Sequence, residues 1–428
     1  MNTPPASLVL IAALLLFTGC TDTPPPSAAS PALAEPSRVT LYHYWDDSFP
    51  RLRDTIAAEA DALNAAQDET RVWVDAVTHE AFKANAKTML RDASSAELYS
   101  WWGGGRTQAL IDDDLVTPLD SWWKQSSSAD AFTPAMITAG CRYGDHFYLV
   151  PLIQGYVGIF YNRAVFDRYG VALPRDWDGF RTACVQLRAA GINPIALGGQ
   201  DAWPAQFWFD YLLLRSAGSA YRQRLIAGEA AFTDPEVRQA FTLWRELIDL
   251  GAFNPKPTAL DWKDAAKLVH ARGAAMTLMG SWIMDPWTEL GWQPGTDYGY
   301  ISFPSLPGSD NATSLTVIDG LVLANSDLPP QAAFPLLDHL IQPAVQARIA
   351  EASGSFSPHR AVSPSPEQIV HRQILDAIGD NELAFAWDLS TKPAAEKAGL
   401  DLFHAFLEDP DRIDELLIAA QAAIDRGE

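Results

Sequence analysis

Residues 96–123 read AELYSWWGGGRTQALIDDDLVTPLDSWW, and this stretch decides how the first part of the chain folds. The aromatic-rich segment 96–102 predicts a β-strand. The glycines at 103–105 predict a sharp turn, because a residue without a Cβ tolerates conformations closed to others, and 107–114 predicts a short helix. Neighbouring strand residues point to opposite faces, so we expect one of Trp101 and Trp102 to face the core and the other to be able to face a ligand.

Working upstream, strands and helices alternate. VTLYHYW (39–45) and RVWVDAV (71–77) predict strands, and residues 49–67 and 80–93 predict amphipathic helices. This alternation predicts an α/β fold with a parallel, doubly wound sheet.

Ligands of such sheets bind beyond the carboxyl ends of the strands. The predicted strand ends therefore bring aromatic and polar side chains to one edge of the sheet: Trp45, Asp46, His79, Glu80 and Trp102.

Working downstream, the pattern restarts near residue 147. Strands are predicted at 147–153, 158–162 and 192–198, helices at 176–191, 203–217 and 234–250, and two strands that return to the first lobe at 297–304 and 315–323. From about residue 330 the chain is predicted to be helical.

Length and composition limit the function. A chain of 428 residues usually forms more than one domain, and 48% hydrophobic with 20% charged residues is typical of a globular protein. A formal charge of −22 argues against nucleic acid and against adsorption to an anionic membrane surface. The 15 tryptophans provide flat surfaces suited to stacking on a neutral ligand.

The N-terminus is interpreted as a targeting segment. LVLIAALLLF (8–17) is an apolar run too short to span a bilayer comfortably, and LLLFTGC resembles a bacterial lipobox that ends at Cys20. Phe17 and the absence of Lys or Arg before the apolar run depart from the usual pattern, so a plain cleaved signal peptide is the alternative. We expect a signal peptide at 1–19, lipidation of Cys20 and a disordered tether at 20–37.

Cys141 and Cys184 are the other cysteines. In an exported protein they could form a disulfide, and two buried thiols are the alternative. No metal-ligand spacing is present in the sequence, and no cofactor is expected.

Four segments in order resemble one known family: VGIFYNRAVFDRYGVALPRDWDGF (157–180), FTDPEVRQAFTLWRELIDLGAF (232–253), DWKDAAKLVHARGAAMTLMGSW (261–282) and AAFPLLDHLIQPAVQARIAEASGSFSPHR (332–360). They are similar to the extracellular solute-binding proteins of carbohydrate ABC importers, a group that includes maltose- and glucose-binding proteins. The resemblance covers nearly everything after the tether.

This resemblance implies two α/β lobes, each a mostly parallel sheet flanked by helices, that close on a neutral carbohydrate and dock on permease subunits. It implies crossover segments near 147–152, 300–304 and 326–330, a first lobe of 38–147 plus 304–328, and a second lobe of 148–303 plus 329–428. We expect a monomer, lipid-anchored to the cell membrane and facing the periplasm or the cell exterior, with no nucleic-acid partner.

A sugar offers apolar C–H faces and a rim of hydroxyls, so its site needs aromatic rings and polar groups together. The candidate ligand-binding residues are Trp45, Asp46, His79, Glu80, Trp102, Gln154, Asp201, Trp203, Trp282, Asp319, Phe356 and Trp387. The resemblance places a polar group at Asp201, a ring at Trp203 and the stacking tryptophan at Trp282. The three aspartates could instead cap helices or accept from loop amides, and His79 could simply start a solvated helix.

Three other functions stay open from sequence: an exported glycoside hydrolase, a surface sugar-capturing lipoprotein without an importer, and a peptide- or polyamine-binding relative. A hydrolase needs two suitably spaced carboxylates, which 53 acidic residues do not exclude. The sequence contains no G-x-S-x-G or H-E-x-x-H motif, so we expect a binding protein and not an enzyme.

Overall fold

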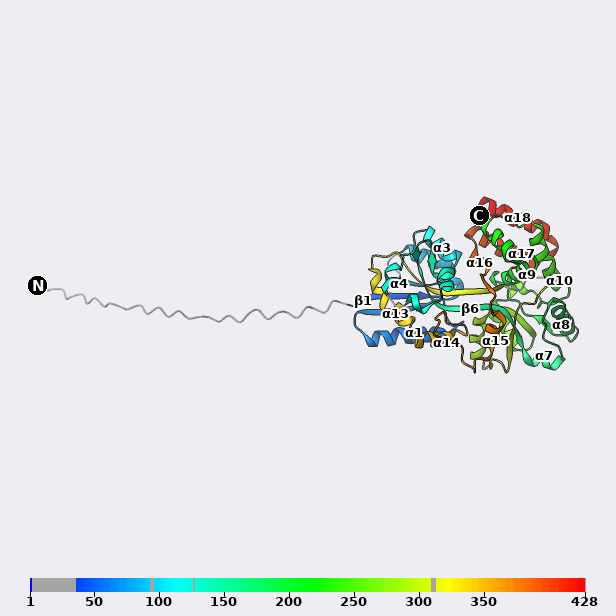
Figure 1. Ribbon diagram of the computed structural model, residues 1–428, viewed down its shortest axis with the longest axis horizontal. Coiled ribbons are helices and arrows are strands. Elements are labelled where there is room, and N and C mark those ends of the chain that lie inside the picture. The colour runs from blue at the N-terminus through cyan, green and yellow to red at the C-terminus, as the bar shows by residue number, and fades with distance from the viewer. Residues whose placement is uncertain (2–35, 93–95, 126–127, 309–312, 428) are drawn as a thin grey trace. The chain divides into compact units, whose positions relative to one another are not determined.

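A computed structural model describes Met1 and residues 36–92, 96–125, 128–308 and 313–427 (Figure 1). The predicted signal peptide and Cys20 lie outside the described residues, as does the tether as far as residue 35. Residues 36–428 form one compact unit, and the fold below is the fold of that unit.

The first sheet begins with three parallel strands. β1 (Ser37–His43) lies between β2 (Thr70–Ala76) and β3 (Leu98–Trp102) and pairs in parallel with both. α1 (Pro50–Ala66) and α2 (His79–Arg91) connect them, and α1 packs its buried side chains, such as Ile56, against this sheet. The predicted alternation of strands and helices is confirmed here, with boundaries within two residues of the prediction.

Two long strands run between the two lobes. The first half of β6 (Leu149–Asn162) pairs with β10 (Thr313–Leu323), and its second half pairs with strands of the second lobe. β10 in turn pairs with β3 through residues 319–323. In Figure 1 both strands cross the middle of the folded unit. The prediction of two separate strands within 147–162 is wrong, because β6 is one unbroken strand of 14 buried residues that changes partners at its middle.

The second lobe is built around β8 (Ala274–Gly280), which lies between β6 and β7 (Asn193–Ile195). β8 is parallel to β7 and antiparallel to β6, so this part of the sheet is mixed. β9 (Tyr298–Ile301) pairs with the second half of β6. The predicted strand at 297–304 therefore stays with the second lobe, and β10 is the strand that reaches the first.

The remaining elements cover these sheets. In chain order they are α3 (Gly105–Asp112), α4 (Asp120–Gln125), α5 (Ser128–Ala131), α6 (Pro134–Met136), the π-turn Ile137–Cys141, the hairpin β4 (Arg142–Tyr143) and β5 (His146–Phe147), α7 (Arg163–Tyr169), α8 (Trp177–Ala189), α9 (Trp203–Ala227), α10 (Pro235–Asp249), the 3₁₀ turn Pro257–Ala259 and α11 (Trp262–His270). They continue with the 3₁₀ turn Ser281–Ile283, α12 (Met284–Glu289), the 3₁₀ turn Pro330–Ala333, α13 (Phe334–Leu340), α14 (Pro343–Ser353), α15 (Ile369–Ile378), β11 (Glu382–Phe385), α16 (Trp387–Ser390), α17 (Pro393–Glu408), the 3₁₀ turn Pro410–Arg412 and α18 (Ile413–Arg426).

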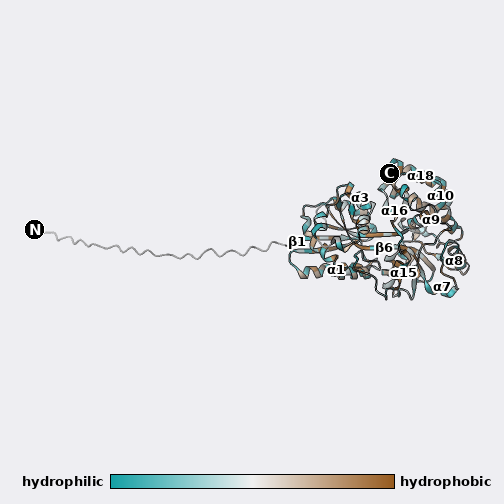
Figure 2. Cartoon of the chain, in the orientation of Figure 1, coloured by the Kyte–Doolittle hydropathy of each residue, from teal (hydrophilic) through white to brown (hydrophobic). Residues whose placement is uncertain are grey.

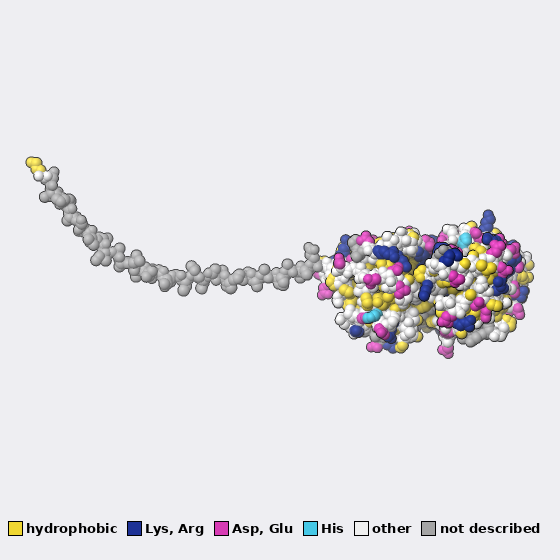
Figure 3. Space-filling model, turned by 90° about the horizontal axis from the view of Figure 1, so that it is seen from above, with side chains coloured by type: hydrophobic (Ala, Val, Ile, Leu, Met, Phe, Trp, Pro, Cys, Tyr) yellow, Lys and Arg dark blue, Asp and Glu magenta, His cyan; other side chains and the backbone are white. Residues whose placement is uncertain are grey.

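The hydrophobic side chains gather on the central strands. In Figure 2 the strands in the middle of the folded unit are coloured hydrophobic, whereas outer helices such as α8 and α18 carry hydrophilic residues. Acidic and basic side chains are interspersed on the face drawn in Figure 3. None of the helices in the described part of the chain has the length and apolarity needed to cross a membrane.

The two cysteines after Cys20 are free thiols in the structure. Cys141 lies in the π-turn of the first lobe and Cys184 in α8 of the second, and each is buried among its own neighbours. The disulfide alternative is therefore wrong for this structure. Burial raises the pKa of both thiols, that of Cys184 to about 12, so they are poor nucleophiles.

The glycines after β3 allow a close approach as well as a turn. Gly104 has φ 89°, and a Cβ at this position would lie 2.3 Å from the backbone oxygen of Leu389 in α16. A Cβ at Gly105 would lie 2.8 Å from the oxygen of Thr391. Gly104 and Gly105 thus let the start of α3, in the first lobe, pack directly on the backbone around α16.

We predict that Gly104→Ala destabilises the protein by at least about 2 kcal/mol, because it combines an unfavourable φ with a backbone clash. Urea unfolding measures this change. Gly144→Ala is the matched control: Gly144 also has a positive φ (59°), but a Cβ there has no atom within 4 Å. Equal losses in the two variants would contradict the close approach as the cause.

Candidate functional site

A cavity of about 300 Å³ lies where the two lobes meet, and side chains of both lobes line it. First-lobe lining residues include Tyr44, Trp45, Ser48, Phe49, His79, Glu80, Lys83, Trp102 and Arg106. Second-lobe lining residues include Asp201, Trp203, Gln206, Phe207, Asp261, Trp262, Lys263, Trp282 and Asp388. Ile153, Val317 and Asp319 come from the long strands β6 and β10.

The first-lobe wall is aromatic. Tyr44 and Trp102 stack with ring centroids 4.7 Å apart, and the His79 ring meets Trp102 edge-on at 5.5 Å. Trp45 packs beside Tyr44 at 5.6 Å. These residues follow β1, start α2 and end β3, so the strand ends do gather rings at one edge of the sheet. Trp102 lines the cavity, whereas Trp101 is buried away from it.

The second-lobe wall is also aromatic. The ring centroid of Trp203, at the start of α9, lies 6.3 Å from the ring centroids of both Trp262 and Trp282. Phe207 follows one turn later in α9. Two glycines leave room for the indole of Trp282. A Cβ at Gly280 would lie 2.1 Å from its ring, and a Cβ at Gly155 would lie 2.9 Å from it, so a side chain at either position would clash. The ring therefore packs against the backbone of β6 and β8.

Asp319 brings a buried carboxyl group to the cavity. The Tyr44 hydroxyl donates to its Oδ1 at 2.5 Å, and the residue is 9% exposed. Burial raises the pKa of Asp319 to about 7, and the hydrogen bond from Tyr44 opposes this shift only in part. Burial likewise raises the pKa of Tyr44 well above its usual value.

His79, Glu80 and Lys83 form a polar group at the start of α2. His79 Nδ1 and Glu80 Oε1 are 2.7 Å apart, and Lys83 Nζ lies 4.0 Å from the same oxygen. Burial lowers the pKa of His79 to about 4, so its ring is neutral at physiological pH. Burial and the nearby Arg106 lower the pKa of Lys83.

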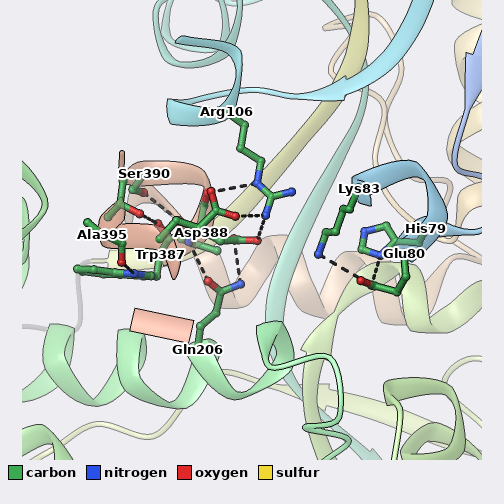
Figure 4. Close-up of polar contacts among 12 residues, drawn as sticks. His79, Glu80, Lys83, Arg106, Gln206, Trp387, Asp388, Ser390 and Ala395 are labelled. Carbon is green, nitrogen blue, oxygen red and sulfur yellow. Dashed lines mark hydrogen bonds and ion pairs between the residues drawn. The ribbon is translucent and has the colours of Figure 1, made fainter. Parts of the chain in front are cut away.

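A second polar group joins the lobes on another side of the cavity (Figure 4). Arg106 in α3 donates to Asp388 at 3.0 Å and to Glu396 at 2.5 Å, and its guanidinium lies 4.9 Å from the ring of Trp102. Gln206 in α9 exchanges two hydrogen bonds with Asp388, at 2.9 Å and 2.8 Å. Arg106 is thus held in place with its charge balanced.

The lobes also touch where α11 meets the loop before α1. Phe49 stacks on Trp262 with centroids 5.7 Å apart, and Lys263 donates to the Ser48 hydroxyl at 3.2 Å. Contacts from both lobes therefore border the cavity on two sides.

The structure brings eight of the twelve predicted ligand residues to the cavity: Trp45, His79, Glu80, Trp102, Asp201, Trp203, Trp282 and Asp319. The alternative that the three aspartates cap helices does not hold for Asp319, whose carboxylate accepts a hydrogen bond from the Tyr44 hydroxyl. Asp201 accepts no side-chain hydrogen bond from any described residue, and α9 begins without a side-chain cap.

The other four lie outside the cavity lining. Asp46 accepts from the backbone N–H of Ser48 at 2.9 Å, which is the loop-amide alternative. Gln154 lies within the β6 ladder and donates to Thr316 at 3.4 Å.

Phe356 pairs its backbone with Gln154 and lines a different cavity. Trp387 is fully buried, and its indole donates to the oxygen of Ala395 at 3.1 Å. Its neighbours Ala386, Asp388 and Leu389 line the cavity instead.

Sequence reasoning missed several lining residues, among them Tyr44, Lys83, Arg106, Gln206, Trp262 and Lys263. A signal existed for Lys83, because residues i and i+4 share a helix face and His79 was already a candidate. A similar signal existed for Gln206, which lies three residues after the candidate Trp203 in α9 and so shares its helix face. Arg106, Trp262 and Lys263 depend on how the lobes meet, which local patterns do not report.

The arrangement suits a small ligand with apolar faces and a polar rim. The aromatic walls offer flat surfaces, and carboxylates, two lysines and amide groups supply acceptors and donors. Within the described ranges, no group of three or more His, Cys, Asp and Glu side chains is arranged to hold a metal ion.

The raised pKa of Asp319 makes a pH-dependent prediction. The folded state keeps the proton of Asp319 up to about pH 7, whereas the unfolded chain loses it near 3.8, so stability from this group falls as pH rises through that window. Asp319→Asn should therefore stabilise the protein relative to wild type increasingly from about pH 4 to about pH 7, since each pKa unit corresponds to about 1.4 kcal/mol. Urea unfolding across this range measures the difference.

A difference that stays constant with pH would contradict this assignment. Tyr44→Phe is the companion variant, because it removes the hydrogen bond that lowers the pKa of Asp319. It should move the upper end of the window to higher pH.

Comparison with known proteins places the chain in a family. Residues 49–347 match the profile of the bacterial extracellular solute-binding proteins. An ABC transporter extracellular-binding protein of Pyrococcus horikoshii is 24% identical, with 96% of this chain and 98% of that protein covered. A probable sugar-binding periplasmic protein of Brucella melitensis is also 24% identical, with 91% and 93% covered.

Solved structures share the two-lobe fold. The bacterial solute receptor AcbH, described as having an exclusive preference for β-D-galactopyranose, superposes with a TM-score of 0.82 at 23% identity and covers 91% of this chain and 99% of its own. A chitin oligosaccharide binding protein superposes with a TM-score of 0.80 at 19% identity, covering 90% and 98%. With the family profile matched over most of its length, the chain belongs to the bacterial extracellular solute-binding proteins.

Proposed function

We propose that this protein captures a neutral mono- or short oligosaccharide between its lobes and delivers it to the permease of an ABC importer. The observation that carries the proposal is the cavity of about 300 Å³ with an aromatic wall from each lobe and a polar rim between them. Stacking on the rings binds the C–H faces of a sugar, and the polar groups select its hydroxyls.

The eight predicted residues that line the cavity are proposed as ligand residues. A volume of about 300 Å³ lies at the small end of the range for ligand pockets, which favours one or a few sugar rings. The names of the relatives support the same class: one is called sugar-binding, and solved structures with this fold include receptors for β-D-galactopyranose and for chitin oligosaccharide.

Binding without catalysis is the proposed activity. The relatives and the family are described as binding proteins, which favours this over a glycoside hydrolase. The name of the Pyrococcus relative supports an ABC transporter over a surface lipoprotein that works without one. A bound sugar recovered intact after incubation would distinguish binding from hydrolysis.

The proposed mechanism is lobe closure. We propose a first lobe of 38–147 plus 304–328 and a second of 148–303 plus 329–428, except that α13 and α14 pack on α1 and move with the first lobe, as the hydrogen bond from Arg348 to Glu59 at 2.6 Å supports. The lobes rotate about the long strands, with ligand shifting the population toward the closed form. The permease would then recognise the closed monomer.

A sugar that binds in the cavity should stabilise the protein against heat. Thermal unfolding of residues 37–428 with D-glucose, D-galactose, maltose, raffinose or chitobiose should show a raised midpoint for one sugar class. Ligand at 100 times its Kd stabilises by about 2.7 kcal/mol, which is several degrees for lobes of this size. X-ray scattering of the same saturated sample should show a compaction and the mass of a monomer.

Two tryptophan variants sharpen this test. Trp282→Ala should weaken binding at least about tenfold, because it removes a cavity ring. Trp73→Ala is the control, since Trp73 is 45% exposed on β2 and lies outside the cavity lining. No midpoint shift with any of these sugars, or equal losses in both variants, would contradict sugar binding in this cavity.

We further propose that Cys20 is lipidated and anchors the protein to the cell membrane, on the strength of the lipobox-like LLLFTGC. The full chain produced in bacteria should fractionate with membranes and carry a lipid on Cys20 by mass spectrometry. Cys20→Ser should release it. A Cys20→Ser protein that stays with the membranes would point to a different anchor.

A further inference from the structure

Two oppositely charged side chains of the cavity make few polar contacts with other described side chains. Lys83 in α2 belongs to the first lobe, and Asp201 before α9 belongs to the second. Both line the same cavity. Among the described residues, the nearest carboxylate to Lys83 Nζ is Glu80 at 4.0 Å, and no side-chain hydrogen bond reaches the carboxylate of Asp201.

The surroundings of Lys83 hold it at the cavity. Its ammonium lies 5.8 Å from the centre of the Trp203 ring. The Glu80 oxygen near Lys83 is already hydrogen-bonded to His79 Nδ1 at 2.7 Å. Figure 4 shows Lys83 with His79 and Glu80, apart from the group around Arg106. An ammonium has three donors, and among the described residues only the Glu80 carboxylate, at 4.0 Å, lies within ion-pair distance of that of Lys83.

The surroundings of Asp201 also hold it at the cavity. Ala202 has φ 60° and ψ −40°, and the N–H of Trp203 donates to the oxygen of Asp201 at 2.7 Å. This is a γ-turn with positive φ, which is rare and strained for a residue other than glycine. It fixes Asp201 and Trp203 as adjacent cavity residues and keeps Asp201 from capping α9.

The charge near Asp201 favours a hydrogen-bond donor from outside the protein. Burial, Glu80 and Asp261 raise the pKa of Asp201, so its carboxylate is poorly compensated. The charges of Lys83 and Lys263 lower the pKa of Asp201, but neither lysine forms an ion pair with its carboxylate. A ligand that donates to Asp201 and accepts from Lys83 would satisfy both groups at once.

We propose that one hydroxyl of the ligand, or two hydroxyls on neighbouring carbons, bridges Lys83 and Asp201 and thereby completes an inter-lobe link that the protein alone leaves open. This inference rests on the proposed function and names two specificity-determining groups within it. The hydroxyl oxygen accepts from Lys83 Nζ while its proton is donated to Asp201, and both hydrogen bonds are charge-assisted. A 1,2-diol of a pyranose carries the required donor and acceptor together.

A double-mutant cycle tests the bridge. Lys83→Met and Asp201→Asn each keep the shape of the side chain and remove its charge, and each should raise the Kd of the tightest binder among the five sugars about 10- to 100-fold. Because the bridge is lost after the first substitution, the double variant should bind at least about fivefold more tightly than the product of the two single losses. Titration calorimetry measures these constants.

Controls separate the bridge from general effects. Lys87→Met changes a lysine one turn further along α2, and Asp178→Asn changes an exposed aspartate of α8; neither residue lines the cavity, and neither variant should alter Kd. Thermal unfolding without sugar checks folding, where the two substitutions should act additively. If Lys83→Met fails to fold, Lys83→Gln, which keeps a donor without the charge, replaces it in the cycle.

The outcomes distinguish this inference from the proposed function. A wild-type protein that binds a sugar while the two losses multiply, or while either loss is absent, overturns the bridge and leaves sugar binding intact. A wild-type protein that binds none of the five sugars overturns both.

Discussion

The structure depends on two strands that belong to both lobes at once. β6 and β10 pair with each other in the middle of the sheet, and each then adds to a different lobe at its far end. β6 is buried along its whole length, so its first half belongs to the interior of one lobe and its second half to that of the other. The cavity forms where these strands change partners, so the site and the connection between the lobes are one piece of architecture.

Around that connection the chain uses aromatic rings and charges for different purposes. Rings form the two walls, and they pack on strand ends or on glycine backbone, as Trp282 does on Gly280. Charges fall into a balanced group, in which Arg106 is matched by Asp388 and Glu396, and a group around Lys83 and Asp201 whose partners are incomplete. The proposed lobe closure would draw on both kinds: the balanced charges hold Arg106 in place, and the incomplete group leaves hydrogen bonds for a ligand to make.

Local patterns predicted the first lobe well because its strands and helices alternate in sequence order and each of its long helices, α1 and α2, buries one face. They failed at β6, where a long run that is buried on every side looks like two strands with a break. The strand-end rule found Trp45, His79 and Trp102, but it also selected Asp46, which accepts from a loop amide outside the cavity lining. The candidates Phe356 and Trp387 come from the C-terminal turns, and neither lines the cavity. For Trp387, only the tertiary structure decides that its neighbour Asp388 reaches the cavity instead.

The burial of Cys141 and Cys184 has a practical consequence for watching this protein move. Both thiols are shielded and unreactive at neutral pH, so the chain from residue 37 onward presents no surface cysteine among its described residues. A single cysteine introduced on the outer face of each lobe would be the preferred target of a maleimide dye. Fluorescence energy transfer between two such dyes could then follow the distance between the lobes in single molecules, without first removing any native residue.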